Sequence, residues 1–386
     1  MKKIKLMNKI AKVGTDVFDR AKYEVGEDLT NEDAIMVRSA ALHDVEFVDT
    51  VAAIARCGAG VNNIPVDKCT DKGIVVFNTP GANANGVKEL ALCALILAAR
   101  DVVGGIKWAE TLKGQEGVAK LVEKGKGAYV GNELVGKTLG VIGLGAIGGM
   151  VANAANSLGM NVMGYDPYLT PKAAWSLSPA IKQAASYDDI FKNCDYISIH
   201  VPATPQTKNM ICEKSISIMK DGVKIINLAR ADLVNAADVK KALAEKKVSV
   251  YVTDFPTEET VGEAGIINIP HLGASTNESE DHCAVMAAQQ LDAYLTTGNI
   301  QNSVNFPNVS LPVSAEHRIC VMHKNIPNML SQITGAFASV NTNIENMANG
   351  SKGEVAYTIV ETNDSIDDKT IDTVMAIDGV FKIKCY

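Results

Sequence analysis

A glycine-rich segment followed by an acidic residue is the feature of this sequence that points most directly to chemistry. Gly143, Gly145 and Gly148 have the spacing GxGxxG, and Asp166 lies 18 residues after the last of them. The first glycine permits a tight turn, the second lets a pyrophosphate approach the backbone, and the third lets a helix pack closely on a strand. An aspartate at that distance can accept the ribose hydroxyls of NAD, whereas its charge would repel the 2′-phosphate of NADP. The spacing therefore predicts a dinucleotide site that prefers NAD.

Three further side chains stand at the ends of apolar runs that we predict to be strands. They are Arg230, Asp254 and His271. In an open parallel sheet such strand ends meet at one edge, where ligands bind. A neutral imidazole can accept the proton of a secondary alcohol near pH 7, and a guanidinium can hold a carboxylate by two parallel hydrogen bonds. This pattern indicates oxidation of a hydroxy acid. Among the other histidines only His200 is near a strand end, and we interpret it as structural.

These residues need a scaffold, and the apolar pattern predicts one. Residues 1–99 alternate short strands and helices, 100–275 repeat the strand–helix rhythm around the glycines, and a long helix at 276–297 suggests a return to the first part. Residues 303–316 carry two prolines and little periodicity, which is typical of a linker. The order βαββαβ in 317–386 indicates a small ferredoxin-like domain. The predicted strands are 34–37, 51–55, 73–77, 138–142, 161–165, 196–201, 223–228, 248–254, 266–269, 318–323, 343–348, 355–362 and 380–385.

The composition argues against several classes of partner and site. The net charge is −7 and no run of five basic residues occurs, so we expect neither nucleic acid nor an anionic membrane as a partner. No apolar stretch is long enough to span a bilayer, and the N-terminus lacks the apolar region of a signal peptide. The eight cysteines are widely spread, without a CxxC or a Cys/His cluster. We therefore expect reduced thiols in a cytoplasmic protein and no metal site.

Four segments in combination resemble the D-2-hydroxyacid dehydrogenase family. They are 132–148, 197–202, 227–231 and 270–276. Segments 55–64 and 77–83, together with the tail, narrow the likeness to the phosphoglycerate dehydrogenases of that family. The resemblance covers essentially the whole chain. It implies oxidation of 3-phospho-D-glycerate (3-phosphoglycerate) to 3-phosphohydroxypyruvate with NAD, the first step of L-serine biosynthesis.

The resemblance also implies an α/β fold with two doubly wound parallel-sheet lobes. A Rossmann lobe for NAD at 100–275 is inserted in a flavodoxin-like substrate lobe, which consists of 1–99 and is completed by 276–305. A linker at 306–316 leads to the ferredoxin-like domain at 317–386.

Arg230 and His271 are the catalytic residues that the resemblance implies. The family's catalytic glutamate follows the pattern Asp-Val-Phe-x-x-Glu-Pro, but here Asp254-Phe-Pro-Thr precedes Glu258 and Glu259, one residue shorter and without the closing proline. Matching the letters selects Glu258, counting forward from Arg230 selects Glu259, and the loop can also leave neither beside His271; Glu258 is our assignment. The expected cofactor contacts are Gly143, Gly145, Ala146, Ile147, Gly148, Asp166, Val201, Pro202, Leu228, Asp254 and Gly273.

A phosphorylated hydroxy acid has two anionic ends, so its binding needs a second cation besides Arg230. Arg56 stands between an apolar strand and the turn Gly58-Ala-Gly60. We assign it to the phosphate, against the alternative that it is an ordinary surface arginine. The two glycines can offer backbone N–H groups to the substrate, and Asn83 is a third expected contact.

The C-terminal block resembles the ACT regulatory domains, which bind amino acids. His323 and Asn325 stand at the strand-to-helix turn that binds the ligand in such domains, and Asn343 opens the facing strand. L-Serine is the expected effector, although asparagine and proline are also simply good turn formers. Because paired ACT domains form their sites across a dimer contact, we expect a homo-oligomer, either a dimer or a tetramer.

Two other functions stay open. One is a dehydrogenase for another D-2-hydroxy acid, against which Arg56 and the tail argue. The other is a non-catalytic NAD-sensing binding protein of the same fold. The tail argues against this function, and a turnover assay would distinguish it from an enzyme.

Overall fold

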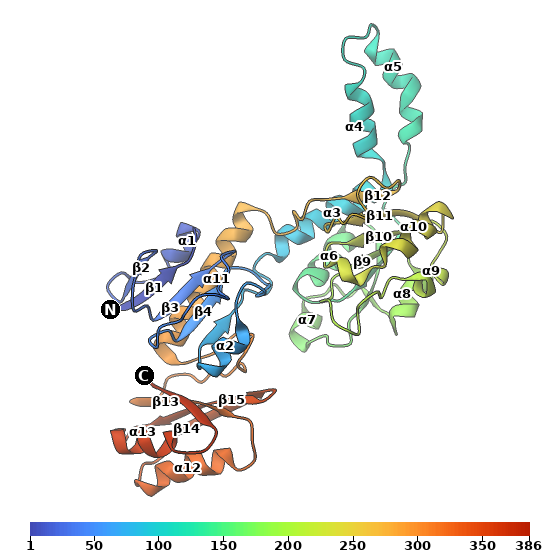
Figure 1. Ribbon diagram of the computed structural model, residues 1–386. Helices are drawn as coiled ribbons and strands as arrows, with labels where there is room; N and C mark the ends of the chain where they lie inside the picture. The colour runs from blue at the N-terminus through green and yellow to red at the C-terminus, as the bar shows by residue number, and fades with distance from the viewer. The chain divides into compact units, whose positions relative to one another are not determined.

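The computed structural model describes all of residues 1–386, which divide into two compact units (Figure 1). The first unit consists of Met1–Asn83 and Glu280–Tyr386, and the second is Ala84–Ser279. None of the helices combines the length and apolar character that crossing a lipid bilayer requires.

The second unit is built on a seven-stranded parallel sheet with the order β12-β11-β10-β9-β6-β7-β8. Its strands are β6 (Thr138–Ile142), β7 (Asn161–Tyr165), β8 (Lys182–Gln183), β9 (Tyr196–Ile199), β10 (Val223–Asn227), β11 (Val248–Thr253) and β12 (Ile266–Asn268). The chain winds from β6 out to β8 and then returns to β9 on the other side of β6. The Rossmann arrangement predicted from the glycines is confirmed, with the winding reversed between β6 and β9, where such sheets bind ligands.

Both faces of this sheet are covered by helices, because its strands are apolar on both sides. Val141 belongs to the core that contains α3 and α6, while the next residue, Ile142, belongs to the core on the opposite face. The helices are α3 (Ala84–Ala99), α6 (Ala146–Ser157), α7 (Pro171–Trp175), α8 (Tyr187–Asn193), α9 (Glu213–Ser217), α10 (Ala236–Ala244) and the 3₁₀ turn η2 (Ala231–Leu233). We expected α3 in the first lobe, but its buried residues Ala91 and Leu95 share a core with α6. The division between the units therefore falls after residue 83 instead of residue 99.

A helical hairpin, absent from our sequence analysis, stands away from this sheet (Figure 1). It consists of α4 (Val102–Glu110), α5 (Val118–Gly125) and the 3₁₀ turn η1 (Lys126–Tyr129). Neither α4 nor α5 contains a buried residue. Trp108 stacks on Tyr129 at 5.4 Å between ring centroids, which ties the two arms together.

The first unit contains a five-stranded parallel sheet with the order β2-β1-β3-β4-β5, as in flavodoxin-like folds. Its strands are β1 (Lys2–Leu6), β2 (Tyr23–Gly26), β3 (Ala34–Val37), β4 (Ala53–Arg56) and β5 (Val75–Phe77), and its short helices are α1 (Lys12–Thr15) and α2 (Val66–Asp71). The long helix α11 (Asn277–Thr297) returns to this sheet, as predicted, and buries Leu291 and Tyr294 in one core with Ile4 and Phe77.

The segment after α11 packs against the same sheet, although its prolines predicted a linker. Asn305 is buried; its Oδ1 accepts a hydrogen bond from Val76 N at 2.8 Å, and its Nδ2 donates to Ile74 O at 2.9 Å. Phe306 is also fully buried. Residues 303–306 therefore form part of the lobe.

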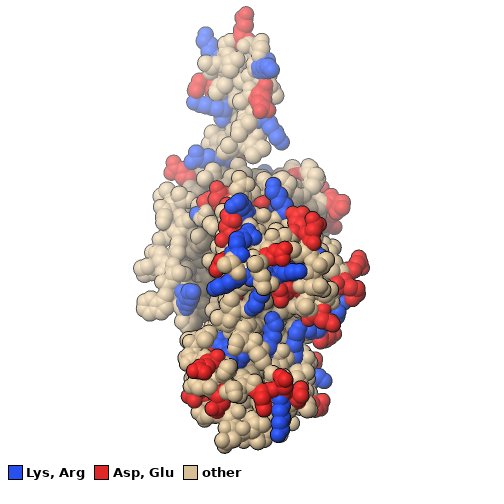
Figure 2. Space-filling model, turned by 90° about the vertical axis from the view of Figure 1, so that its left-hand side faces the viewer, with Lys and Arg blue, Asp and Glu red and all other residues tan.

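The C-terminal domain has the predicted order βαββαβ and an antiparallel sheet, β14-β15-β13-β16. Its elements are β13 (His317–Lys324), α12 (Met329–Ser339), β14 (Asn346–Lys352), β15 (Val355–Thr362), α13 (Asp368–Met375) and β16 (Val380–Cys385). Along β13, Ile319 and Val321 pack in a core with residues of α12 and α13, whereas Cys320 and Met322 join the core of the five-stranded sheet. Both faces of the antiparallel sheet are therefore covered. On the side of the molecular surface that Figure 2 shows, acidic and basic side chains are mixed.

Candidate active site

The three glycines form a tight turn between β6 and α6, for three different steric reasons. Gly143 has φ +87°, and a Cβ there would lie 2.6 Å from the carbonyl oxygen of His200. A Cβ at Gly148 would overlap the carbonyl oxygen of Gly143, so the helix and strand can approach only without a side chain. Gly145, in contrast, faces open space. The tight turn at Gly143 and the close packing at Gly148 are those that the spacing predicted. The approach of a pyrophosphate to Gly145 stays a prediction.

The N-terminus of α6 provides an anion site above this turn. Gly145 is its N-cap and supplies no side-chain hydrogen bond, and no acidic residue stands in the first turn. The free N–H groups and the positive end of the helix dipole favour a pyrophosphate. The open side of Gly145 leaves room for one, so these residues fit a dinucleotide.

Asp166 lies at the end of β7, next to the glycine turn. Its Oδ2 accepts a hydrogen bond from Leu144 N and its Oδ1 accepts one from Tyr168 N, each at 2.9 Å. The aspartate is half-buried. Its carboxylate thus ties the turn to β7. Its contact with the ribose of a dinucleotide stays a prediction.

The contacts of His200, next to the glycine turn, are those of a structural residue. A ring nitrogen of His200 lies 2.8 Å from the hydroxyl of Ser198, and burial lowers the pKa of the imidazole to about 4. His200 N donates to Ile142 O at 2.8 Å, at the switch point of the sheet. Of the remaining expected cofactor contacts, two are the first residues of α6, Ala146 and Ile147. The others follow strand ends: Val201 and Pro202 after β9, Leu228 after β10 and Gly273 after β12.

Arg230 is presented by a loop that a buried asparagine organises. Asn227, the last residue of β10, is fully buried; its Nδ2 donates to Arg230 O at 2.8 Å and its Oδ1 accepts from Ala229 N at 3.1 Å. The side chain of Arg230 itself is exposed and donates from Nη1 to Ala229 O. The guanidinium therefore has donors left for a substrate carboxylate.

Asp254 organises the loop that carries His271. Its carboxylate is 1 % exposed and accepts hydrogen bonds from Leu272 N at 2.7 Å and Gly273 N at 2.8 Å. His271 has φ +52°, a left-handed conformation that costs a non-glycine residue free energy. The two bonds to Asp254 stabilise the loop immediately after this strained residue. Asp254 therefore holds the loop that carries the imidazole.

Phe255 lies between the two candidate catalytic side chains. Its ring centroid is 4.7 Å from that of His271 and 5.8 Å from the guanidinium carbon of Arg230. Glu258 and Glu259 are both exposed, and together with Phe255 they line a cavity of about 330 Å³. No hydrogen bond or ion pair joins either glutamate to His271, so the choice between them stays a prediction.

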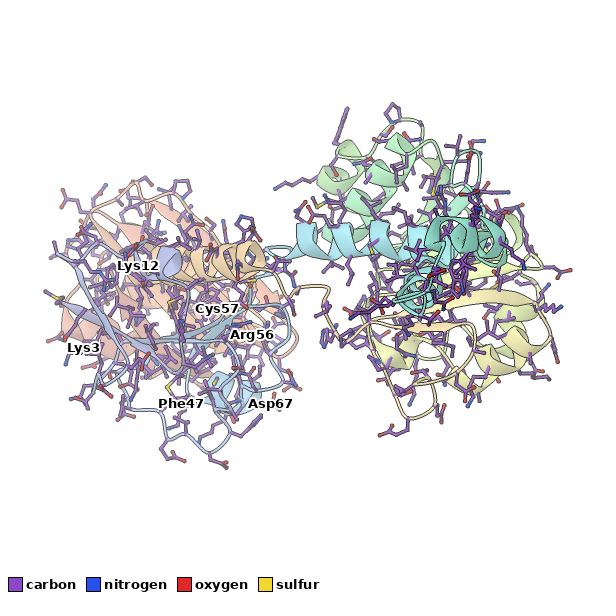
Figure 3. All side chains as sticks on the ribbon, turned by 90° about the horizontal axis from the view of Figure 1, so that it is seen from above. Lys3, Lys12, Phe47, Arg56, Cys57 and Asp67 are labelled. Carbon is purple, nitrogen blue, oxygen red and sulfur yellow. The ribbon has the colours of Figure 1, made fainter.

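In the first unit, Arg56 lies over the glycine turn that follows β4 (Figure 3 labels it beside Cys57). A Cβ at Gly58 would overlap the guanidinium of Arg56, which places the cation directly against this turn. A hydrogen bond from Asn78 Nδ2 to Ala59 O, at 2.6 Å, also stabilises this turn. Gly60 and Asn83 are half-buried.

The three expected effector ligands are not brought together within one chain. His323 is 2 % exposed, with its ring nitrogens 2.9 Å from Lys324 O and 2.8 Å from Thr358 Oγ1. Asn325 donates from Nδ2 to Gly353 O, at the turn after β14. Asn343 precedes the other end of β14, a seven-residue strand about 20 Å long.

Residues 94–275 match the family described as D-isomer specific 2-hydroxyacid dehydrogenase, NAD binding domain. The D-3-phosphoglycerate dehydrogenase of Escherichia coli strain K12 is 30% identical over 353 residues, which are 88% of this chain and 82% of that protein. The chain belongs to the D-isomer specific 2-hydroxyacid dehydrogenase family. The second unit thus contains a domain of the NAD-binding type, as the glycine spacing predicted.

Two further relatives bear on the family. The D-3-phosphoglycerate dehydrogenase of Methanocaldococcus jannaschii is 35% identical over 297 residues, 75% of this chain, and the aligned part is 54% of that longer protein. The chain therefore spans about half the length of that relative. The NAD⁺-bound 3-phosphoglycerate dehydrogenase of Entamoeba histolytica has a TM-score of 0.60 and 27% identity, covering 79% of this chain and 98% of that one.

The sequence reasoning missed the residues that hold this family's strand-end loops in place. Asn227 was part of a recognised segment but had no assigned role, although a polar residue that ends an apolar strand is a signal of a buried hydrogen-bonding group. Phe255 and Asn78 gave no comparable signal, because an aromatic or an asparagine after a strand is common.

Proposed function

We propose that this chain catalyses the NAD-dependent oxidation of 3-phospho-D-glycerate to 3-phosphohydroxypyruvate, the first step of L-serine biosynthesis. The observation that carries the proposal is that buried Asn227 and Asp254 order the loops presenting Arg230 and His271, at the sheet edge that also holds the glycine turn. The choice of substrate rests on the relatives that are named D-3-phosphoglycerate dehydrogenases. Cytoplasm is the proposed location, where eight free thiols are stable.

In the reaction, Arg230 binds the substrate carboxylate with its free N–H groups and fixes the orientation of the hydroxyl-bearing carbon. His271 accepts the hydroxyl proton on an imidazole nitrogen as the neighbouring C–H bond breaks. The glycine turn, the N-terminus of α6 and Asp166 would hold NAD, which would supply the acceptor for the hydride from that carbon. Asp254 keeps the His271 loop in its strained conformation throughout.

The carboxylate partner of the imidazolium is assigned to Glu258, with Glu259 as the alternative. Either residue needs a shift of the exposed 256–259 segment, because Phe255 is the side chain beside His271. Such a shift would replace an aromatic contact by a charge pair that strengthens when His271 becomes cationic. In the first unit, Arg56 and the turn from Gly58 to Gly60 are assigned to the substrate phosphate.

A panel of 2-hydroxy acids, followed by NADH absorbance, tests the activity. 3-Phosphoglycerate is expected to exceed D-glycerate in kcat/KM by about 10²-fold or more, because the phosphate makes charge-assisted hydrogen bonds. Arg56→Met should remove this advantage and leave turnover of D-glycerate nearly unchanged. A higher kcat/KM for another hydroxy acid would favour the second enzyme function, and NAD binding without any turnover would favour a sensor.

The C-terminal domain is assigned as an L-serine site that two copies of the chain complete. β14 is an edge strand, and edge strands readily pair with another chain. Antiparallel pairing of β14 with the β14 of a second copy would bring Asn343 of one copy to the end where Asn325 of the other lies. This accounts for their separation within one chain. His323, being buried, would act by supporting the turn at Lys324.

Calorimetry of L-serine binding and inhibition kinetics test the effector site. Serine must bind the less active state more tightly to inhibit. Asn325→Ala and Asn343→Ala should each abolish inhibition, and a mixture of the two variants should recover part of it, since mixed dimers contain one intact site. If serine inhibits the wild type but not the mixture of the two variants, the site is not shared between two copies.

A homo-oligomer is part of this proposal, and the α4–α5 hairpin supports it independently. Val102, Val103, Ile106 and Val118 are exposed on helices that no other part of the second unit buries. An apolar hairpin of this kind is suited to packing on a second copy. Ile106→Glu should lower the oligomeric state in sedimentation, whereas Lys107→Glu should not.

A further inference from the structure

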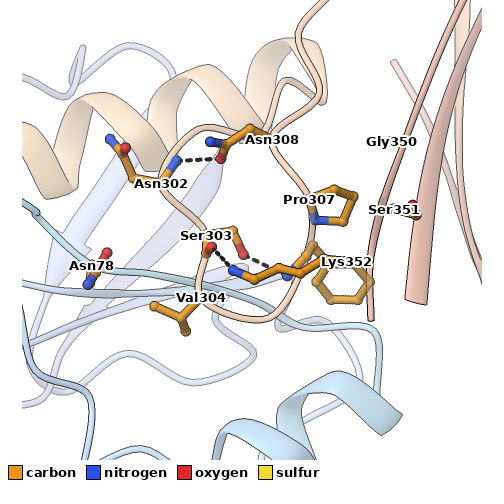
Figure 4. A pocket seen from close by; sticks show the side chains of 10 residues that line it. Asn78, Asn302, Ser303, Val304, Pro307, Asn308, Gly350, Ser351 and Lys352 are labelled. Carbon is orange, nitrogen blue, oxygen red and sulfur yellow. Dashed lines mark hydrogen bonds between the residues drawn. The ribbon is translucent and has the colours of Figure 1, made fainter. Parts of the chain in front are cut away.

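A cavity within the first unit has no role in the proposed reaction. It has a volume of about 640 Å³, a size at which proteins hold small organic ligands. Its lining comes from three places (Figure 4): Asn78 after β5, the loop 302–308 after α11, and residues 350–352 of β14. The cavity thus lies where the C-terminal domain contacts the five-stranded-sheet lobe.

Lys352 is the only charged residue in the lining, which contains no carboxylate. Its Nζ donates to Ser303 O at 2.9 Å, and it forms no ion pair. An ammonium group has three N–H donors, so two stay available. Lys352 is exposed, and partial desolvation lowers its pKa.

Neutral donors surround this cation. Asn308 Oδ1 accepts a hydrogen bond from Asn302 N at 2.9 Å, which fixes the Asn308 amide and leaves its Nδ2 without a partner. The side-chain amide of Asn302 and the hydroxyl of Ser351 make no hydrogen bond within the protein. One cation, several unused donors and no anion together match an oxyanion.

We propose that this cavity binds a small organic anion through one carboxylate or phosphate group. Lys352 is the counter-ion, and Asn302, Asn308 and Ser351 donate hydrogen bonds to the oxygens.

The cavity is connected to the turn assigned to substrate. Asn78 N donates to Asn302 O at 3.4 Å, and Asn78 Nδ2 donates to Ala59 O at 2.6 Å. An anion that orders the 302–308 loop therefore acts through Asn78 on Ala59, between Gly58 and Gly60. This coupling rests on the proposed function, whereas the binding does not.

Binding is measured without turnover, on the full chain, by ³¹P line broadening with inorganic phosphate and by saturation-transfer NMR with succinate. Lys352→Gln and the isosteric Asn308→Asp should weaken binding by about ten-fold or more. Asn308→Asp keeps the acceptor for Asn302 N, so it tests the charge and not the loop structure. The exposed Lys369→Gln, with the same change of net charge, and Arg230→Gln should both leave binding within about two-fold.

Phosphate binding alone would identify a phosphate ligand, and succinate binding alone a carboxylate ligand. Saturable binding that Lys352→Gln leaves intact, and that Arg230→Gln or Arg56→Met removes, would place the anion in the proposed substrate site and overturn the proposal. Equal binding by wild type and Lys352→Gln, or no saturation at about 20 mM, a range typical of weak charge-assisted binding, would overturn it too. The coupling predicts that the bound anion changes KM for 3-phosphoglycerate in the wild type and not in Lys352→Gln. An unchanged KM with binding intact would refute the coupling alone.

Discussion

Arg318 and Glu361 form an ion pair at the base of the C-terminal domain with side chains only 2% and 0% exposed. Nη2 of Arg318 lies 2.6 Å and Nε 3.1 Å from the same carboxylate oxygen. The guanidinium also donates to Thr297 O and Leu311 O, so it joins the end of α11 to the domain. Burial by itself would raise the pKa of Glu361, but the bonds from Arg318 and Ser314 outweigh it and hold the pKa below its usual value.

Replacing Arg318 alone should therefore destabilise the first unit strongly. Arg318→Met leaves the buried carboxylate of Glu361 without a cation, with only the hydrogen bonds from Ser314 and Asn346, which costs about 3–5 kcal/mol. The double variant Arg318→Met/Glu361→Leu should recover most of this loss. Urea unfolding followed by circular dichroism measures both, with the exposed Lys369→Met as control. A double variant as unstable as the single one would show that the network's other hydrogen bonds dominate.

His200 should make stability depend on pH in mildly acidic solution. Its folded-state pKa of about 4 lies below the unfolded value of 6.5, so between these values the unfolded chain binds the extra proton. Stability is complete above about pH 6.5 and falls as the pH drops towards 4, by up to about 3 kcal/mol. His200→Gln should flatten the stability curve in that window. An unchanged slope would assign the pH dependence to other groups.

Asp166 should set the choice of cofactor. The unaltered protein is expected to prefer NAD over NADP by one to a few orders of magnitude, of order ~2–4 kcal/mol. Asp166→Asn removes the charge and keeps an oxygen acceptor for Leu144 N, while its NH₂ group replaces the acceptor of the exposed Tyr168 N. The glycine turn should therefore survive while the preference for NAD narrows. The ratio of kcat/KM for the two cofactors measures this. Equal use of both by the wild type would refute the assignment.

His271→Ala should lower kcat by about 10²–10⁴, the usual contribution of a general base, with NAD affinity nearly unchanged. Asp254→Asn should lower kcat as well. Leu272 N and Gly273 N both donate to the carboxylate of Asp254, and in the variant one of these N–H groups would face an NH₂ group, at a cost of about 1–3 kcal/mol. Titration of NAD fluorescence quenching, beside steady-state kinetics, separates binding from chemistry. Full activity of His271→Ala would remove the imidazole from the mechanism.

The two glutamates should differ sharply in effect. Glu258→Gln is expected to reduce kcat and shift its acidic pH limb, whereas Glu259→Gln should leave both near the wild-type values. The reverse result would identify Glu259 as the catalytic carboxylate, the residue that counting forward from Arg230 without a gap selects. Normal rates and pH profiles in both variants would mean that His271 works without a carboxylate from this loop.

The arrangement of strand ends was predictable because it depends on a short-range pattern. Apolar runs that end in Arg230, Asp254 and His271 must present these residues at one sheet edge, once the sheet is parallel. The Glu258 loop lacks such a rule, since its shortened length changes its path in a way that spacing cannot determine. The α4–α5 hairpin was missed because exposed apolar residues such as Ile106 follow no burial pattern. The prolines of 303–316 suggest a linker that starts too early, because Asn305 is buried by hydrogen bonds rather than by apolar character. The boundary at residue 305 that the resemblance implies keeps this asparagine in the lobe.

The discontinuity of the first unit has a consequence for how the chain is made. Tyr294 and Phe306 complete the core around Ile4 and Phe77, yet residues 84–279 separate the two parts. At about 5–20 residues per second, a ribosome needs on the order of 10–40 s to synthesise the intervening segment. The inserted unit can fold during that time, while the N-terminal strands wait with an unfinished apolar face. We therefore expect nascent chains that stall before α11 to be bound by chaperones through the N-terminal strands, and to be released when residues 280–309 emerge.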